Sequence, residues 1–226
     1  MIEAGLVLSR ALHYAASLVL FGVVLFPLYA YPRKVRPTAG IDRWLRAIAG
    51  WASFVALLSG VIWFAGVVAS MTDGVVGWGA IRSVLMETSF GEVSILRFIL
   101  ATIIVVQLAV QARSPAHQLD WLSAALCAGL LASLAGVDHT QISDGIDRIV
   151  HTIADGLHLL AAGAWLGGLV ALFVLVPKSL RTTSTAVDVE AGNAALGFSG
   201  MGYVAVATLV VSGLINSWFL VGSLPI

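Results

Sequence analysis

The chain of 226 residues contains a single cysteine and few charged residues. Cys127 lies in an apolar stretch, so the sequence has no disulfide framework and no CxxC metal site. Charged residues make up 11% of the chain, which is well below the share found in ordinary soluble domains. The formal net charge is zero, and this argues against a nucleic-acid partner. Hydrophobic residues make up 59% of the chain, which indicates a protein that resides in a lipid bilayer.

Six apolar segments are long enough to cross a membrane as helices. They cover approximately 6–31, 46–70, 93–112, 119–137, 149–176 and 200–222. Because these segments use nearly all of the chain, residues 1–226 are expected to form one transmembrane helical domain. The predicted fold class is all-α, a polytopic membrane bundle of about six transmembrane helices with a short surface helix around 80–87. Gly163 and Gly167 are four residues apart in the fifth segment and indicate close helix packing.

Basic residues predict how the bundle is oriented in the membrane. The connection after the first segment is strongly basic and contains Arg33, Lys34, Arg36, Arg43 and Arg46. The positive-inside rule places such a connection in the cytoplasm. The N-terminus is therefore predicted to be periplasmic, and six crossings return the C-terminus to the periplasmic side.

The fifth apolar segment carries polar side chains on one helical stripe. His151, Asp155 and His158 fall within about 40° of one another at 100° per residue. Polar groups are costly to desolvate in a membrane, so such a stripe requires partners. Imidazole ligates copper, zinc, nickel or iron, and a carboxylate commonly orients the other ring nitrogen. The stripe is therefore a candidate metal site in which Asp155 is a ligand or an orienting group.

Two further histidines fall on the same predicted side of the membrane. His13 lies roughly 10 Å into the first segment, and His158 lies at a similar depth in the fifth, at about 1.5 Å per residue. His139 follows the fourth segment at the membrane surface. We therefore predict a metal-binding vestibule that is lined by His13, His139, His151, Asp155 and His158.

Each of these residues also has a structural interpretation. His13 could be an interhelical hydrogen-bonding residue, and His139 could be a solvated loop residue. The stripe on the fifth segment could be a polar network between helices that holds no metal. His117, in a predicted cytoplasmic connection, is expected to be an ordinary surface residue. Thioether sulfur also suits Cu(I), although single methionines in apolar protein usually serve packing. The candidates are Met71, Met86 and Met201.

Four stretches of the sequence carry a resemblance to a known family. The most specific is ADGLHLLAAGAWLGGLVAL at 154–172. The others are SRALHYAASLVLFG at 9–22, SFGEVSILRF at 89–98 and LGFSGMGYVAVATLVVSGLINSWFLVG at 196–222. Together they resemble, in family order, the CopD family of bacterial copper-resistance and copper-uptake membrane proteins.

The resemblance implies a multi-pass protein of the bacterial inner (plasma) membrane that handles copper, as Cu(I) or Cu(II). It also implies a small periplasmic copper-binding protein, similar to CopC, as a partner. The membrane histidines of the family would correspond to His13, His139 and His158, with Asp155 preceding the last, whereas His151 matches less closely. Longer family members continue with further C-terminal helices that this sequence lacks.

We therefore expect a copper-binding membrane protein that takes up or transfers copper from the periplasmic side and is not an enzyme. Its expected partners are the lipid bilayer, copper and the CopC-like protein. A b-type haem electron-transfer protein is an alternative, because histidines on different membrane helices can supply axial ligands. A membrane scaffold without metal is another alternative. An optical spectrum separates the haem interpretation, and metal analysis then separates copper binding from a scaffold.

Overall fold

The computed structural model of the protein describes residues 2–32, 35–72, 74, 76–113, 120–136, 145–181 and 185–221. All regular structure in these residues is helical, which confirms the predicted fold class. The elements are α1 (Ile2–Ala30), α2 (Ala39–Met71), α3 (Trp78–Glu87), α4 (Ser89–Arg113), α5 (Asp120–Ala132), the 3-10 helix η2 (Ser133–Gly136), α6 (Gly145–Arg181) and α7 (Thr185–Val221). Helix α3 confirms the short helix predicted around 80–87.

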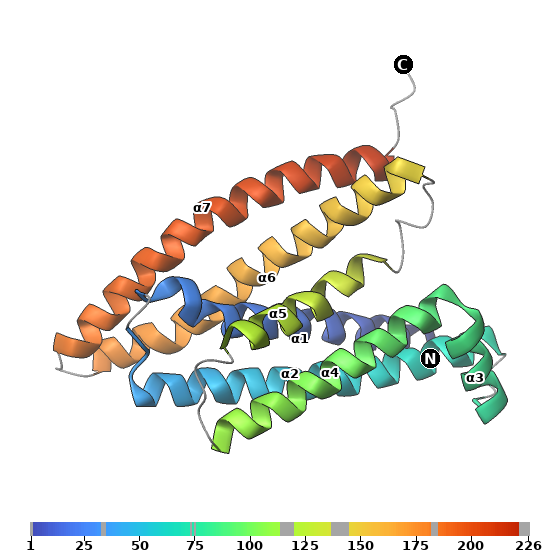
Figure 1. Ribbon diagram of the computed structural model, residues 1–226, viewed down its shortest axis with the longest axis horizontal. Helices are drawn as coiled ribbons and strands as arrows, with labels where there is room; N and C mark the ends of the chain where they lie inside the picture. Colours follow the sequence, from blue (N-terminus) through green and yellow to red (C-terminus); the bar gives the residue numbers. More distant parts are fainter. Residues whose placement is uncertain are drawn as a thin grey trace.

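Helix α1 is the central helix of the bundle and contacts α2, α5, α6 and α7 (Figure 1). Its side chains Leu20, Val23 and Phe26 are at most 1% exposed. They share one core with Ile104 of α4 and Leu131 of α5. Lipid tails are as apolar as these side chains, so close packing, and not escape from water, is what holds the helices together.

Five helices are long and apolar enough to cross a membrane: Glu3–Ala30, Ala39–Met71, Ser89–Arg113, Gly145–Leu175 and Asp188–Phe219. A shorter apolar helix, Asp120–Ala135, occupies the position of the predicted fourth segment. At about 1.5 Å per α-helical residue and about 2.0 Å per 3-10 residue, α5 and η2 together extend about 28 Å. This length is close to the hydrocarbon thickness of about 30 Å. The six predicted segments thus correspond to five long helices and one short helix.

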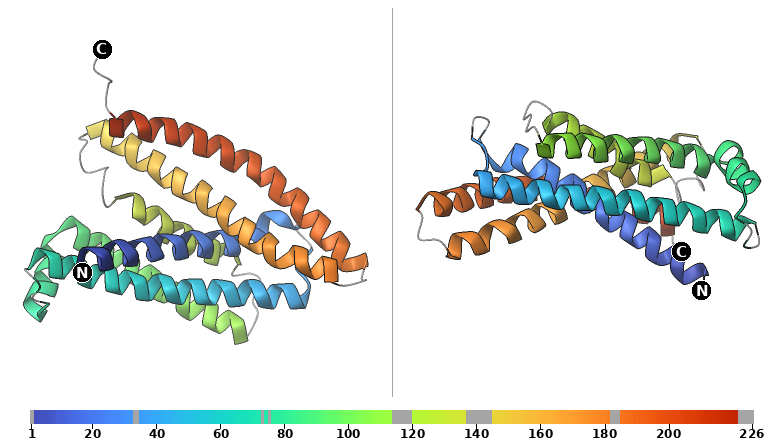
Figure 2. Two further views of the ribbon diagram at one scale, coloured as in Figure 1. Left: turned by 180° about the vertical axis from the view of Figure 1, so that it is seen from behind. Right: turned by 90° about the horizontal axis from the view of Figure 1, so that it is seen from below.

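The helix ends gather at two opposite ends of the bundle (Figures 1 and 2). The start of α1, the end of η2, the start of α6 and the end of α7 lie at one end, which we call the N-terminal end. The start of α2 and the end of α4 lie at the opposite end, which we call the basic end. The sequence of these helix ends and of the connection before α2 contains Arg36, Arg43, Arg46 and Arg113. The start of α1 and the end of α7 therefore face the same side, as six crossings require. Which end is periplasmic remains a prediction.

Helix α7 begins at Thr185, well before the apolar segment predicted at 200–222. The first turns of α7 are polar, and the contacts of Glu190 explain why they are helical and packed against the bundle. Oε1 of Glu190 accepts hydrogen bonds from the Tyr31 hydroxyl at 3.1 Å and from the Thr38 amide at 2.9 Å. These contacts dock α7 on the connection between α1 and α2. Hydropathy detects only the membrane-embedded part of such a helix, so the predicted start was wrong.

Helices α1 and α6 approach each other closely at Gly22, Gly163 and Gly167. A Cβ atom at Gly22 would lie 2.6 Å from Cα of Gly167, and a Cβ at Gly167 would lie 2.6 Å from Cα of Gly22. No side chain fits between the two backbones at this crossing. The close packing predicted from Gly163 and Gly167 is confirmed, and its partner is α1.

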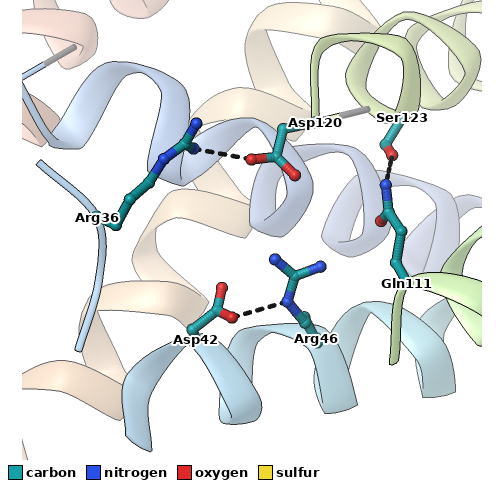
Figure 3. A network of polar contacts seen from close by, with 6 residues as sticks. All are labelled: Arg36, Asp42, Arg46, Gln111, Asp120 and Ser123. Atoms are coloured by element: carbon teal, nitrogen blue, oxygen red, sulfur yellow. Dashed lines mark hydrogen bonds and ion pairs between the residues drawn. The ribbon is translucent and has the colours of Figure 1, made fainter. Parts of the chain in front are cut away.

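Two ion pairs lie at the basic end, one between segments and one within α2 (Figure 3). Nη1 of Arg36 lies 2.8 Å from Oδ2 of Asp120, and Nε of Arg46 lies 2.8 Å from Oδ2 of Asp42. Both pairs line a cavity of about 50 Å³ between α1, α2, α4 and α5. The first pair ties the start of α5 to the connection between α1 and α2, and the second supports the first turns of α2.

Candidate metal-binding residues

His13 projects from α1 toward α2 in the half of the bundle nearest the N-terminal end. The residue is 2% exposed, and Nδ1 lies 2.8 Å from the backbone oxygen of Ala56. Gly60, one turn further along α2, leaves room for the imidazole. A Cβ atom at Gly60 would lie 3.1 Å from Cε1 of His13. Any side chain at Gly60 would therefore press on the ring.

The hydrogen bond to Ala56 sets the tautomer of neutral His13. A carbonyl oxygen can only accept, so Nδ1 carries the proton and Nε2 presents a lone pair. Nε2 is buried and has no hydrogen-bond partner among the described residues. Leaving a buried polar atom unpaired is unfavourable. A histidine that donates one N–H to a carbonyl and offers its other nitrogen is the usual form of a metal ligand, so Nε2 of His13 is suited to a metal ion.

A cavity of about 10 Å³ adjoins His13 between α1, α2 and α4. This volume is close to that of one water-sized probe, so a single small ion or water fits. Trp63 lines the cavity with its ring centroid 5.8 Å from that of His13. Arg97 of α4 also lines it, and its guanidinium lies 5.4 Å from the centre of the Trp63 ring. A fixed positive charge thus stands beside the candidate ligand.

Arg97 is held in this position by η2. It is 4% exposed, and its Nη2 and Nε donate to the backbone oxygen and the hydroxyl of Ser133 at 2.6 and 3.2 Å. The hydroxyl of Ser133 in turn donates to the backbone oxygen of Leu130 at 2.6 Å. The 3-10 turn at the end of α5 therefore presents acceptors to a cation inside the bundle.

The polar stripe of α6 lies on one face, as predicted, and it faces α7. Three pairs join the two helices: His158 with Ser212, Asp155 with Asn216, and His151 with Phe219. Nδ1 of His158 lies 3.0 Å from Oγ of Ser212, and Nδ2 of Asn216 lies 3.5 Å from Oδ1 of Asp155. The ring centroids of His151 and Phe219 are 5.0 Å apart. The two helices run antiparallel, so residues early in α6 contact residues late in α7 (Figure 1). The stripe is therefore a contact between helices as well as a candidate ligand set.

Ser212 sets the tautomer of His158 in the same way that Ala56 sets the tautomer of His13. The Ser212 hydroxyl donates to the backbone oxygen of Thr208 at 2.5 Å, so its lone pair accepts from Nδ1–H of His158. Nε2 of neutral His158 then presents a lone pair. His13 and His158 thus share the tautomer that suits coordination through Nε2. His151 is 3% exposed, and its Nδ1 is buried without a hydrogen-bond partner among the described residues.

The candidate residues divide between two helix contacts. His13 faces α2, whereas His151, Asp155 and His158 face α7. In the part of the chain that the structure describes, no three His, Cys, Asp or Glu side chains form a group that could hold a metal ion. His139 lies outside the described residues, so its place relative to the other histidines remains a prediction.

The partners of these residues carry different signals in the sequence. Ser212, Asn216 and Phe219 recur at spacings of four and three on α7, which is the periodicity of the stripe on α6. This matching stripe is the sequence signal for the pairing of the two helices. The partner of His13 is the backbone oxygen of Ala56, and no side-chain pattern indicates such a contact.

A family model described as copper resistance protein D-like, N-terminal domain, matches residues 1–149. The matched region contains His13 and His139 and ends just before the polar stripe of α6. It therefore includes the part of the bundle formed by α1 to α5.

Curated relatives extend the similarity along the rest of the chain. Copper resistance protein D of Pseudomonas syringae pv. tomato is 29% identical, over 92% of this chain and 67% of the relative. Inner membrane protein YebZ of Escherichia coli (strain K12) is 25% identical, over 96% of this chain and 72% of the relative. Copper transport protein CutJ of Bacillus subtilis (strain 168) is 26% identical, over 99% of this chain and 41% of the relative. No solved structure matches the chain.

The comparisons agree with the resemblance seen in the sequence. The family model covers well over half of the chain, and the five long apolar helices form the polytopic bundle expected of a membrane protein. The chain spans 41% to 72% of the length of these relatives. The protein belongs to the copper resistance protein D-like family.

Proposed function

We propose that the protein binds copper within the bacterial inner membrane and takes it up or transfers it from the periplasmic side. The observation that carries this proposal is the buried Nε2 of His13, whose lone pair has no partner among the described residues. Two relatives are named for copper resistance and copper transport, and a third is named as an inner membrane protein. The proposed activity is binding and transfer, and it involves no catalysed reaction.

His13 and His158 would act as ligands through Nε2, because each has its Nδ1–H engaged elsewhere. His139 would complete the set at the membrane surface. Asp155 and His151 would hold the ligand-bearing face of α6 against α7. A copper ion would enter from the N-terminal end and pass inward by exchange between partly occupied sites. A small periplasmic copper-binding protein of the CopC type is the proposed donor.

Arg97 favours Cu(I) over Cu(II) at His13. Coulomb repulsion scales with the product of the two charges, so the guanidinium opposes a divalent ion twice as strongly as a monovalent one at the same distance. Imidazole accepts copper in both oxidation states, so the difference comes from the surrounding charge. We therefore propose Cu(I) as the form held in the cavity beside Trp63 and Arg97.

A scaffold role for the stripe on α6 is a second candidate, because Ser212, Asn216 and Phe219 of α7 contact it directly. Interhelical polar contacts of this kind stabilise membrane bundles by about 0.6 kcal/mol on average. Under this interpretation His158 holds α6 and α7 together, and only residues elsewhere bind copper.

The test measures copper per chain and Cu(I) affinity in purified wild type and in His13→Ala, His158→Ala and His117→Ala, each with its thermal unfolding midpoint. We expect His13→Ala and His158→Ala to lower the affinity sharply, and His117→Ala to leave it unchanged. Loss of stability without loss of copper in His158→Ala would favour the scaffold role. Wild-type affinity in all three variants would overturn the proposal, and a Soret band in the wild type would favour a haem protein.

A further inference from the structure

A groove of about 640 Å³ runs between α2 and α4 on the surface of the bundle. This volume lies within the range of about 300–1,000 Å³ that is typical of small-molecule sites. One end of the groove is basic, and the remainder is largely apolar. Its lining includes Arg43, Arg46, Gly50, Trp51 and Phe54 of α2 and Leu108 of α4.

The length of the groove matches one leaflet of a bilayer. Arg43 and Phe54 mark its two ends on α2. They are eleven residues apart, which corresponds to about 16 Å along a helix. Half of the hydrocarbon thickness of a bilayer is about 15 Å. A molecule with its charged end at Arg43 and an apolar chain reaching Phe54 would therefore span one leaflet.

The charge at the basic end of the groove is available to a ligand. Arg43 is exposed and forms no hydrogen bond or ion pair with another described residue. The preceding carboxylate, Asp42, is engaged by Nε of Arg46 at 2.8 Å. Figure 3 shows this pair on the inner side of α2, beside the cavity that also holds Asp120. The carboxylate that precedes Arg43 in the sequence thus lines the inner cavity, not the groove, and is already paired with Arg46.

A second groove on α2 provides a contrast. It lies against α1, has a volume of about 460 Å³, and is lined by apolar residues such as Leu12, Val19 and Trp44. No charged residue lines it. This groove can accept an acyl chain of any membrane lipid and has nothing with which to select a headgroup. Of these two surface grooves, the one at Arg43 combines an apolar channel with a basic end.

We propose that the α2–α4 groove binds one anionic phospholipid from the leaflet that meets the basic end of the bundle. The Arg43 guanidinium holds the phosphate, because its planar fork matches a phosphate geometrically and electrostatically. An acyl chain lies along Trp51 and Phe54 of α2 and Leu108 of α4. Basic pockets between membrane helices bind anionic headgroups for the same physical reason. This site is separate from the candidate copper ligands and does not depend on the proposed function.

Gly50 leaves the groove open because it has no side chain, and a larger residue at this position would fill the groove. A Cβ atom at Gly50 would meet no atom of the protein within 4 Å. The substitution Gly50→Leu therefore fills the groove without a clash, and leucine has a higher helix propensity than glycine. Gly200 on the exposed face of α7 also has nothing within 4 Å, so Gly200→Leu is the matched control.

The experiment titrates purified full-length protein in mild detergent with phosphatidylglycerol or phosphatidylcholine and counts bound lipids by native mass spectrometry. One exposed arginine near a membrane surface contributes roughly a fivefold preference for an anionic lipid, so we expect about that preference in the wild type. Arg43→Gln should abolish the preference, and Arg43→Lys should retain part of it. Gly50→Leu should reduce binding of the tightest lipid. Arg82→Gln, an exposed arginine on α3 at the opposite end, and Gly200→Leu should both behave as wild type.

An unchanged phosphatidylglycerol preference in Arg43→Gln would overturn the proposal. Wild-type lipid binding in Gly50→Leu would also overturn it, because the groove would then not be the binding surface. Inorganic phosphate added in excess should leave the bound lipid in place, since the acyl chain contributes to the affinity. Displacement of the lipid by inorganic phosphate would reassign the site to a free anion and refute a lipid site.

Discussion

Replacement of Gly22 by alanine is the sharpest test of how the bundle positions its candidate ligands. The contact of Gly22 with Gly167 fixes α1 against α6, and these helices carry His13 and His158. A Cβ at Gly22 would lie 2.6 Å from Cα of Gly167, whereas unstrained carbon atoms stay about 3.5 Å apart or more. Relief of this contact alone requires the helices to separate by about 0.9 Å. The backbone oxygen of Gly163 would lie closer still to the new Cβ, and no rotamer change can move backbone atoms away.

The structure predicts a graded series of costs at the α1–α6 crossing. Gly22→Ala and Gly167→Ala should each destabilise the fold by about 2–3 kcal/mol, at the upper end of overpacking effects. Gly163→Ala should cost less, about 1 kcal/mol, because its Cβ would meet side-chain atoms and not backbone: Cδ2 of Leu131 at 2.8 Å and Cδ1 of Phe21 at 3.0 Å.

Gly202→Ala on α7 is the control, because a Cβ at that position meets nothing within 4 Å. Its effect should be within about 0.5 kcal/mol. Unfolding in mixed micelles with increasing sodium dodecyl sulfate measures all four free energies, and Cu(I) affinity is measured on the folded fraction. We expect copper affinity to fall with Gly22→Ala and to be unchanged with Gly202→Ala. Equal stability of Gly22→Ala and Gly202→Ala would refute the close α1–α6 contact.

The contact of Ser212 with His158, the raised pKa of Tyr31 and the orientation of the bundle in the membrane can each be tested. Ser212→Ala frees Nδ1–H of His158 and should lower Cu(I) affinity about 10–100-fold, as measured by competition titration. Burial and a neighbouring α7 carboxylate raise the pKa of Tyr31 above its ordinary value. The folded state therefore holds this proton more tightly, so stability should fall as pH rises above about 10, and Tyr31→Phe should flatten that fall. A reporter fused after Arg36 should report cytoplasm, and one fused after Gly145 should report periplasm.

Each of these three predictions has a control or an outcome that contradicts it. Ser199 of α7 is exposed, and among the described residues its hydroxyl donates to the backbone oxygen of Ala195 in its own helix, so Ser199→Ala should leave copper affinity unchanged. Tyr203 is 80% exposed, so Tyr203→Phe should keep the wild-type slope of stability against pH. Reversed reporters would place the candidate histidines on the cytoplasmic side and would remove the basis for uptake from the periplasm.

The fold was predictable because lipid imposes a simple code on the sequence. Each long apolar run must satisfy its backbone within one helix, so the runs identify the helices directly. The residues at which the helices begin were less predictable. Asp42 and Arg46 form an ion pair of 2.8 Å that extends α2 toward the N-terminus, beyond its apolar run. Glu190 similarly extends α7 through hydrogen bonds to Tyr31 and Thr38. Polar contacts outside the hydrocarbon determine helix ends, and hydropathy does not detect them.

The candidate site was predictable only in part. Helical periodicity placed His151, Asp155 and His158 on one face, because that depends on the geometry of a single helix. It did not determine which helix the face meets, since apolar helices can pair in many ways. The position of Arg97 beside Trp63 depends on Ser133 of a 3-10 turn, which no periodicity reveals. Single-helix properties follow from the sequence, and contacts between helices require the fold.

The pH dependence of copper binding distinguishes histidine ligands from methionine ligands. A histidine binds metal only when its coordinating nitrogen carries no proton, so protons and copper compete. For an imidazole of ordinary pKa, about 6.5, the neutral fraction falls about tenfold between pH 7.5 and 5.5. If histidines coordinate Cu(I), the affinity should therefore fall as the pH drops from about 7.5 to 5.5. Thioethers gain no proton, and a site built from Met71, Met86 or Met201 would be nearly independent of pH. A Cu(I) competition titration, corrected for the protonation of the competitor, measures the profile. A flat corrected profile would transfer the proposed ligand role from the histidines to the methionines, and His13→Ala would then retain full affinity.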